Sequence, residues 1–151
     1  MREMSDLQDR TTGDDLLAIK QAVIDIEAQI EGVIRAEGLL EGLPEFPLFI
    51  NYWVSGTPVY SQGRGFVCVH LLNADLHLSR SVLPNDELET TPFILRTFDA
   101  FARRITLGGL VEHCLITRYE IGGFNYGATQ TYGIRFPLEI KVRHTGITVG
   151  T

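Results

Sequence analysis

A run of alternating residues near the end of the chain constrains the fold more than any other feature. Apolar side chains occupy every second position of this run, namely Tyr132, Ile134, Phe136, Leu138, Ile140 and Val142. The opposite face carries polar and charged residues, namely Thr131, Arg135, Glu139, Lys141 and Arg143. Because successive side chains of a strand point to opposite faces, the run predicts a long strand with one face in a core. Pro137 interrupts it, and because proline cannot donate a ladder hydrogen bond, we expect an edge position or a bulge there.

Two segments have the periodicity of amphipathic helices. The first carries a capping pattern at Thr12 and Asp15, followed by apolar residues at spacings of three and four. These are Leu16, Ile19, Val23, Ile26, Ile30 and Val33. With Gly38 as its stop, this helix is expected to span about 22 residues. A short coiled coil is the alternative. The second helix is expected to start with Thr91 as its cap and Pro92 at its first position, and to end at Gly108.

Further strands are expected over residues 48–54, 66–72 and about 110–121, from aromatic and β-branched composition. Between the first two, "SGTP" (55–58) and "QGRG" (62–65) indicate a turn region. The second of these strands can continue through a bulge near Asn73, and a polar loop is expected over residues 81–91. The order α-β-β-α-β-β predicts an α+β fold: a mainly antiparallel four- to five-stranded sheet with two helices on one face. The length of 151 residues predicts one domain, with a polar N-terminal arm (1–13) and a short C-terminal tail (145–151).

Charge and cysteine content restrict the function classes. The net charge is −6, from 13 Lys and Arg against 19 Asp and Glu, which argues against a surface that wraps nucleic acid. It is compatible with a channel that DNA passes through without sticking. The two cysteines lie in apolar runs and are expected to be reduced core thiols. The first residues carry no apolar segment typical of a signal peptide, and no apolar run reaches about 20 residues, so a soluble protein without membrane contact is expected.

The stretch "YEIGGFNYGATQTYGIRF" (119–136) raises the question of a phosphate-binding loop. Its glycines lack the spacing of a dinucleotide fingerprint, no Gly-Lys-Ser/Thr follows, and the chain continues into a strand. A long hairpin explains the stretch better than a ligand loop. In that hairpin Gly122, Gly123, Asn125 and Gly127 would supply positive φ angles.

No pattern of catalytic or metal-binding residues stands out. Cys68 and His70 share a strand face and could reach one metal, but no third ligand is identifiable, so a buried cysteine beside a hydrogen-bonded histidine is favoured. Ser55 lacks the flanking glycine of a nucleophile elbow. The carboxylates of residues 25–27 and 85–89 are expected to be solvated. The sequence therefore predicts neither an enzyme nor a cofactor or metal site.

Several motifs occur together in a familiar order. They are "GLPEFPLFINYW", a long strand ending in "LHLSR", the helix "PFILRTFDAFARR" closing with "LGGLV", and "ITRYEIGGFNYGATQTYGIRFPLEIKV". Over about residues 15–144 this pattern resembles the tail terminator proteins of long-tailed bacteriophages, also called tail completion or tail-to-head joining proteins.

The resemblance implies a structural virion protein that forms a homo-hexameric ring. Such a ring caps the tail tube, stops its polymerisation and joins the tail to the head, so its partners are further copies, the tail tube protein and a head-connector or neck protein. DNA passes through the lumen without specific binding, and six copies at −6 each would carry −36. The expected location is the tail or neck of the virion, after assembly in the host cytoplasm.

The residues themselves indicate candidate assembly surfaces. Exposed aromatics at a hairpin tip are typical of an interface, so Gly123, Phe124, Asn125 and Tyr126 are candidates. The alternative is that Phe124 and Tyr126 fold back onto their own sheet. The polar loop is the second candidate, through its residues Pro84, Asn85, Asp86 and Glu87.

Two other functions stay open at this point. One is a different neck component, such as a head-completion or connector-adaptor protein. The other is a small enzyme or ligand-binding α+β domain with its site between the second helix and the sheet.

Overall fold

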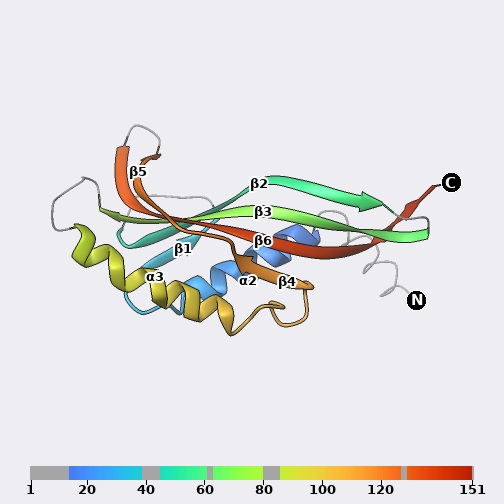
Figure 1. Ribbon diagram of the computed structural model, residues 1–151, viewed down its shortest axis with the longest axis horizontal. Coiled ribbons are helices and arrows are strands. Elements are labelled where there is room, and N and C mark those ends of the chain that lie inside the picture. Colours follow the sequence, from blue (N-terminus) through green and yellow to red (C-terminus); the bar gives the residue numbers. More distant parts are fainter. Residues whose placement is uncertain (1–13, 39–44, 61–62, 80–85, 127–128, 151) are drawn as a thin grey trace.

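The computed structural model describes residues 14–38, 45–60, 63–79, 86–126 and 129–150. Two helices and six strands follow one another along the chain (Figure 1). They are α2 (Asp14–Glu27), β1 (Arg35–Glu37), β2 (Leu48–Tyr60), β3 (Gly63–Ser79), α3 (Asp86–Ala102), β4 (His113–Ile116), β5 (Glu120–Tyr126) and β6 (Thr129–Val149). Among the described residues no helix is long and apolar enough to cross a membrane.

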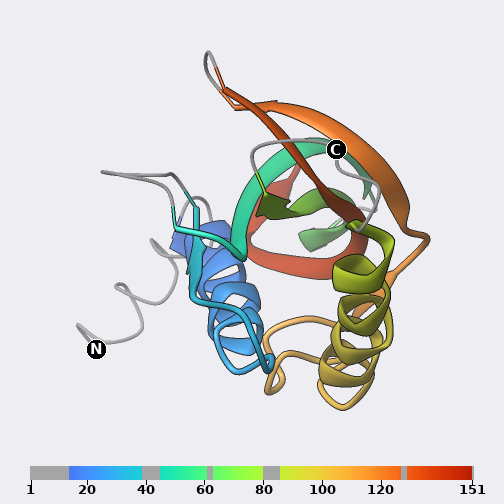
Figure 2. The same ribbon diagram turned by 90° about the vertical axis from the view of Figure 1, so that its left-hand side faces the viewer.

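All six strands belong to one mixed sheet with the order β1-β2-β3-β6-β4, and β5 pairs with β6 beyond the end of β4. β1 is parallel to β2, and the other pairings are antiparallel. The sheet curls into a half-barrel, with α2 and α3 along its lower side in Figure 2. The expected fold class, a mainly antiparallel four- to five-stranded sheet with two helices on one face, was therefore wrong. The chain is richer in strand than expected, and its sheet is mixed and strongly curved.

The core lies between the helices and the even-numbered residues of the two longest strands. From β6 these are the apolar residues expected from the alternation, Ile134, Phe136, Leu138, Ile140 and Val142, each at most 2% exposed. Phe49, Leu72 and Leu76 face them from β2 and β3, and Val23 of α2 and Phe101 of α3 close the core. The periodicity of residues 132–142 thus predicted this strand face correctly.

Two local features accompany the curl of the sheet. β2 carries an irregularity between Trp53 and Ser55, where the pairing with β3 shifts register, and such bulges increase strand twist. Gly133 of β6 pairs with Gly122 of β5, and a Cβ atom at Gly133 would lie 1.8 Å from the carbonyl oxygen of Leu76. The close approach of β3 and β6 at this end therefore requires glycine. The sequence placed a bulge near Asn73 of β3, whereas the pairing of β3 with β6 shifts register between Arg64 and Phe66 and between His77 and Ser79.

The first helix is shorter than expected. α2 ends at Glu27, and the chain then makes a series of tight turns, in which Ile30 donates to the carbonyl of Glu27 and Val33 to that of Ile30. These turns keep Ile30 buried at nearly the helical spacing, which explains why the apolar pattern continues past the helix. Gly32, at a φ of 93°, reverses the chain in place of the expected stop at Gly38.

The second helix starts earlier than expected. α3 begins at Asp86, so residues 86–91 are helical where a polar loop was expected, and Pro92 lies inside the helix. The first turns contain Asp86, Glu87 and Glu89, and acidic residues favour a helix N-terminus. Residues 81–85 lie outside the described part. The helix ends at Ala102, before the expected stop at Gly108.

The strands also differ from the expected segments. β2 continues through the expected turn at residues 55–58 to Tyr60, and β3 is unbroken from Gly63 to Ser79. The single strand expected over about 110–121 is two strands, β4 and β5. β6 extends to Val149, into the segment expected to be a C-terminal tail.

Pro137 lies in the middle of the sheet, because β6 pairs with β3 on one side and with β4 and β5 on the other. The expectation of an edge strand was therefore wrong. The carbonyl of Pro137 accepts a hydrogen bond from the backbone N–H of Thr117, between β4 and β5. Since the N–H and C=O of one strand residue point the same way, the missing donor of Pro137 faces this gap between two strands. No ladder hydrogen bond is lost there.

Candidate functional site

A polar network fills the curved end of the sheet beneath the β5–β6 hairpin. Asp75 is 4% exposed and accepts two hydrogen bonds from Arg135, from Nε at 2.8 Å and from Nη2 at 3.0 Å. The hydroxyl of Tyr52 donates to Asp75 Oδ2 at 2.9 Å and accepts from Arg135 Nη2 at 2.9 Å. A carboxylate, a guanidinium and a phenol from three strands therefore satisfy one another.

The electrostatics of this network favour a structural role. Burial raises the pKa of Tyr52, and the hydrogen bond with Asp75 raises the pKa of Arg135. Burial lowers the pKa of neighbouring His77, whose Nδ1 is hydrogen-bonded to the hydroxyl of Thr131. At neutral pH the network thus holds one compensated ion pair beside neutral side chains. Its paired groups lock three strands of the curled end together.

The expected hairpin is present, and β5 and β6 pair from Glu120–Arg135 to Tyr126–Thr129. Phe124 is half-buried and folds back onto the sheet, with its ring 4.9 Å from the Arg135 guanidinium and 5.8 Å from the His77 ring. This is the alternative arrangement that the sequence left open for Phe124. Gly123 and Asn125 are next to it and exposed, and they line a cavity of about 440 Å³ with the network.

The backbone conformation of the hairpin glycines differs from the expected positive φ angles. Gly122 and Gly123 are ordinary strand residues, and neither they nor Asn125 has a positive φ. Gly127 and the side chain of Tyr126 lie outside the described part. Of the second candidate surface, Pro84 and Asn85 also lie outside it, whereas Asp86 and Glu87 form the first residues of α3.

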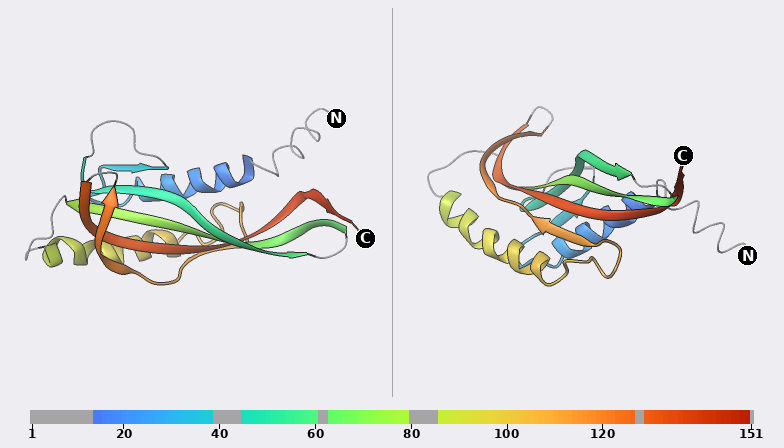
Figure 3. Two further views of the ribbon diagram at one scale, coloured as in Figure 1. Left: turned by 90° about the horizontal axis from the view of Figure 1, so that it is seen from above. Right: turned by 45° about the vertical axis from the view of Figure 1, so that its right-hand side comes forward.

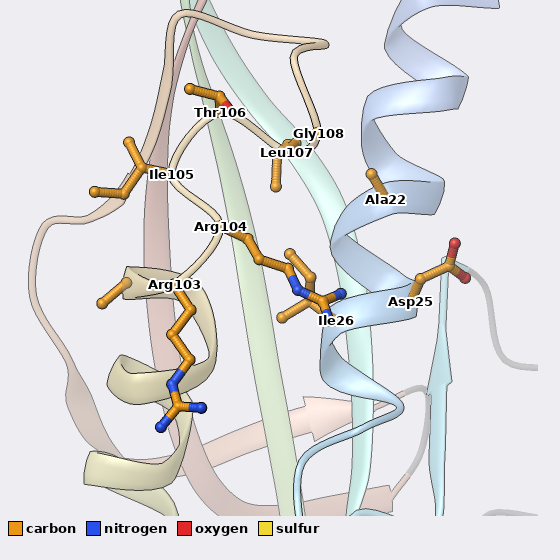
Figure 4. Close-up of a pocket in the computed structure, with 10 residues that line it drawn as sticks. Ala22, Asp25, Ile26, Arg103, Arg104, Ile105, Thr106, Leu107 and Gly108 are labelled. Carbon is orange, nitrogen blue, oxygen red and sulfur yellow. The ribbon is translucent and has the colours of Figure 1, made fainter.

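A groove of about 690 Å³ runs between α2 and the turn after α3 (Figure 4). Arg104 reaches across it and donates to Gln29 Oε1 at 3.0 Å, whereas Arg103 turns away along α3 and pairs with Asp99. Leu107 has a φ of 50°, which is unusual for a non-glycine residue, and its side chain is buried. The groove is wide enough for a small ligand, and the carboxylate that lines it, Asp25 of α2, accepts a hydrogen bond from Gln21 Nε2 at 2.9 Å.

A second cavity lies between α3 and β4, where a ligand site was expected under the small-enzyme alternative. Its volume is about 160 Å³, below the range of about 300–1,000 Å³ typical of small-molecule sites. Phe98 and Phe101 line one side of it, and Cys114 and Ile116 line the other. This space is therefore small and apolar.

Glu27 is a buried carboxyl group that the sequence assigned to solvent. It is 0% exposed, and its Oε1 accepts a hydrogen bond from Asn51 Nδ2 at 2.6 Å. Its Oε2 has no hydrogen-bond partner among the described residues, and burial raises its pKa well above the usual value. Position 27 follows Val23 by four and Ile19 by eight, so helical spacing alone places it on the buried face.

The cysteines and histidines do not form a metal centre. Among the described residues no three His, Cys, Asp or Glu side chains come together as a metal site requires. Burial raises the pKa of Cys114 to about 12 and also raises that of Cys68, so both thiols are protonated at neutral pH. Cys68 Sγ lies 3.8 Å from His70 Nδ1, the arrangement favoured from the sequence.

The three longest strands project beyond the helices as a ribbon (Figures 1 and 3). We call this ribbon the β-extension; it comprises residues 55–60 of β2, 63–69 of β3 and 142–149 of β6. Within the described residues its two outer strands pair only with β3, so each has an unpaired edge. Val59 and Tyr60 are 62% and 64% exposed at its end. An unpaired edge with apolar side chains is a template for pairing with another chain.

No protein-family model and no curated protein matches this chain.

Proposed function

We propose that this protein is a structural subunit that assembles with copies of itself into a ring. The observation that carries the proposal is the β-extension. It exposes apolar side chains and two unpaired strand edges, which a lone chain leaves in water. Contiguous exposed apolar surface and open edges are typical of assembly surfaces.

The geometry of the β-extension favours a head-to-tail contact. Its two edges belong to different strands, β2 and β6, which run in the same direction because each is antiparallel to β3. The β2 edge of one copy can therefore meet the β6 edge of the next in a contact between two different surfaces. Repeated contacts of this kind close into a ring when the rotation between copies closes.

Together with the motif order over residues 15–144, this surface supports a role in a bacteriophage tail. In that role the ring caps the tail tube, stops its polymerisation and joins the tail to the head. The acidic balance of −6 per chain is compatible with DNA passing through a lumen without binding. Gly123 and Asn125 are exposed beside the hairpin and are candidates for a contact outside the ring.

Light scattering on size-exclusion peaks tests self-assembly. Wild-type protein is expected to form a closed oligomer, and V59K is expected to be monomeric because a lysine on an edge strand opposes pairing. L88K is the matched control: Leu88 is 80% exposed on α3, away from the β-extension, and its replacement is expected to leave the oligomer intact. A wild-type chain that stays monomeric at high concentration would contradict the proposal.

A second measurement tests the role at the tail. Added to polymerising tail tubes, the wild-type protein is expected to shorten them and to appear at one end in electron micrographs. Tubes of unchanged length, with an oligomer that binds head connectors instead, would contradict the tube-capping role and support another neck component.

A further inference from the structure

Five aromatic rings form a continuous series that starts in the body of the sheet, at Trp53 and His70, and continues along the β-extension. It starts at Trp53, which packs against the core, and ends at exposed Tyr60. Successive ring centroids are 5.5 Å apart for Trp53–His70, 5.1 Å for His70–His144, 5.3 Å for His144–Phe66 and 5.2 Å for Phe66–Tyr60. The rings come from β2, β3 and β6, so the series joins all three strands of the β-extension to the body of the protein.

The central contact of this series is a hydrogen bond between two histidines. Nε2 of His70 lies 2.9 Å from Nε2 of His144. One of these nitrogens must carry a hydrogen and the other must offer a lone pair. The contact therefore requires at least one of the two rings to be neutral. Two imidazolium rings would place two N–H groups and two positive charges against each other.

Two further groups lie beside the outer ring nitrogens of the pair and influence which nitrogens carry hydrogens. Asp15, at the N-terminal end of α2, places Oδ2 4.0 Å from Nδ1 of His144. On the far side, Sγ of Cys68 lies 3.8 Å from Nδ1 of His70. When His144 carries a hydrogen on both nitrogens, its Nδ1 faces the Asp15 carboxylate and its Nε2 donates to His70 Nε2, and the hydrogen of the neutral His70 ring then lies on Nδ1 beside the thiol.

We propose that the His70–His144 pair is a proton-controlled latch that holds the β-extension against the body of the protein. With one neutral ring the hydrogen bond forms and the series of rings is continuous. A second proton, taken from solvent by His70 Nε2, removes the acceptor and separates the rings. The latch needs no other reactant, because only this proton is gained.

The side chains that surround the pair are one carboxylate and several uncharged groups, and this arrangement is consistent with opening by acid. From α2, the carboxylate of Asp15 lies 4.0 Å from Nδ1 of His144, the ring nitrogen that does not contact His70. Trp53 from β2 and Phe66 from β3 are uncharged, and burial keeps Cys68 a neutral thiol by raising its pKa. Burial, and secondarily His144, lower the pKa of His70 below its usual 6.5.

The direction of the pH effect follows from that shift. An unfolded or released His70 takes up a proton near pH 6.5, whereas the packed ring resists protonation. The latch therefore contributes fully above about pH 6.5 and weakens progressively as the pH falls below it. The β-extension is expected to be ordered at neutral pH and loosened in mild acid.

Trp53 gives a direct measurement, since it is the only tryptophan and its ring contacts His70. Fluorescence is followed from pH 8 to pH 5 on dilute full-length protein, together with amide hydrogen exchange at both pH values. The expected result is a fluorescence change below pH 6.5, with protection factors, which correct for the slower chemical exchange in acid, lower by about tenfold or more in the β-extension and unchanged in the core strands.

Variants separate the latch from general acid effects. H70F retains a ring beside Trp53 but cannot accept a hydrogen bond or take up a proton, so its fluorescence and protection factors are expected to be independent of pH in this range. H113Q is the control, because His113 lies on β4 and pairs with Glu139, and it is expected to keep the wild-type response.

A wild-type response identical to that of H70F would overturn the inference. If H70F does not fold, the inference is tested by NMR titration of the wild-type His70 and His144 ring protons. Two coupled steps support the latch, and two independent steps contradict it. The same measurements on V59K, which is expected to be monomeric, keep this outcome separate from that of the assembly experiments.

Discussion

β2 is one continuous strand whose two halves lie in different environments. Residues 48–51 are buried beneath the helices, and Phe49 is 0% exposed; residues 54–60 are exposed, and Tyr60 is 64% exposed. Both halves pair with β3, with one irregularity between Trp53 and Ser55. The ladder hydrogen bonds therefore extend beyond the region where side chains bury apolar surface. We infer that the inner half stabilises the fold and that the outer half is available for other contacts.

The largest expected effect is on the free energy of unfolding, when one aromatic residue from each half of β2 is replaced by alanine. F49A removes a ring that packs against Phe136 in the core, and is expected to lower the free energy of unfolding by about 3–5 kcal/mol. Y60A removes an exposed ring from the end of the β-extension and is expected to cost less than about 1 kcal/mol. Urea unfolding of both variants checks this. Equal losses would mean that the two halves of β2 contribute equally to stability.

A smaller effect compares two glycines that each face a carbonyl of the neighbouring strand. A Cβ at Gly133 would lie 1.8 Å from Leu76 O, and one at Gly65, where φ is 80°, would lie 2.2 Å from His144 O. G133A is expected to cost about 1–3 kcal/mol of global stability, because the clash lies in the core half.

G65A is expected to loosen the β-extension and leave global stability almost unchanged. Amide exchange resolves the two results, since only the strands around residue 65 should exchange faster in G65A. If G65A unfolds the whole chain as readily as G133A does, then the β-extension and the core are one cooperative unit.

This difference between the halves also explains which parts of the fold could be predicted. The even-numbered residues of β6 from 134 to 142 are buried in the core, so alternation identified the strand correctly. Gly56 and Pro58 in the outer half of β2 resembled a turn, because turn residues are depleted from strands that must fill a core. The outer half fills no core and tolerates both. The fold class was missed partly because the outer half of β2 was predicted to be a turn. It was also missed because the tight turns bury Ile30 at helix-like spacing, so the expected helix extended over β1, the parallel strand that makes the sheet mixed.

The polar network was partly visible in the sequence. Alternation placed Arg135 on the face of β6 opposite the apolar residues, where it lies. Its partner Asp75 is 60 residues away, and no local pattern indicates that the two meet. The same holds for His70 and His144, which are 74 residues apart. Glu27 is different, because its spacing from Val23 placed it on the buried face, and its charge alone led to the wrong prediction.

The smallest expected effect concerns pH and contrasts the buried carboxyl group of the core half with the His70–His144 pair. Burial raises the pKa of Glu27 above its usual 4.5, so the folded protein holds this proton more tightly than the unfolded chain does. Its contribution to stability is complete below about pH 4.5 and is lost as the pH rises through the folded-state value. This is opposite in direction to the histidine latch, which weakens as the pH falls.

E27Q separates the two effects, because glutamine has nearly the same shape and cannot ionise. It can still accept the hydrogen bond that Asn51 donates to Oε1. The variant is expected to be more stable than the wild type at pH 8 and nearly equal to it at pH 4.5. Urea unfolding across this range checks the core, while Trp53 fluorescence in the same samples should still change below pH 6.5. If E27Q abolished that change as well, the core and the β-extension would share one titrating group, and the contrast between the two halves of the sheet would fail.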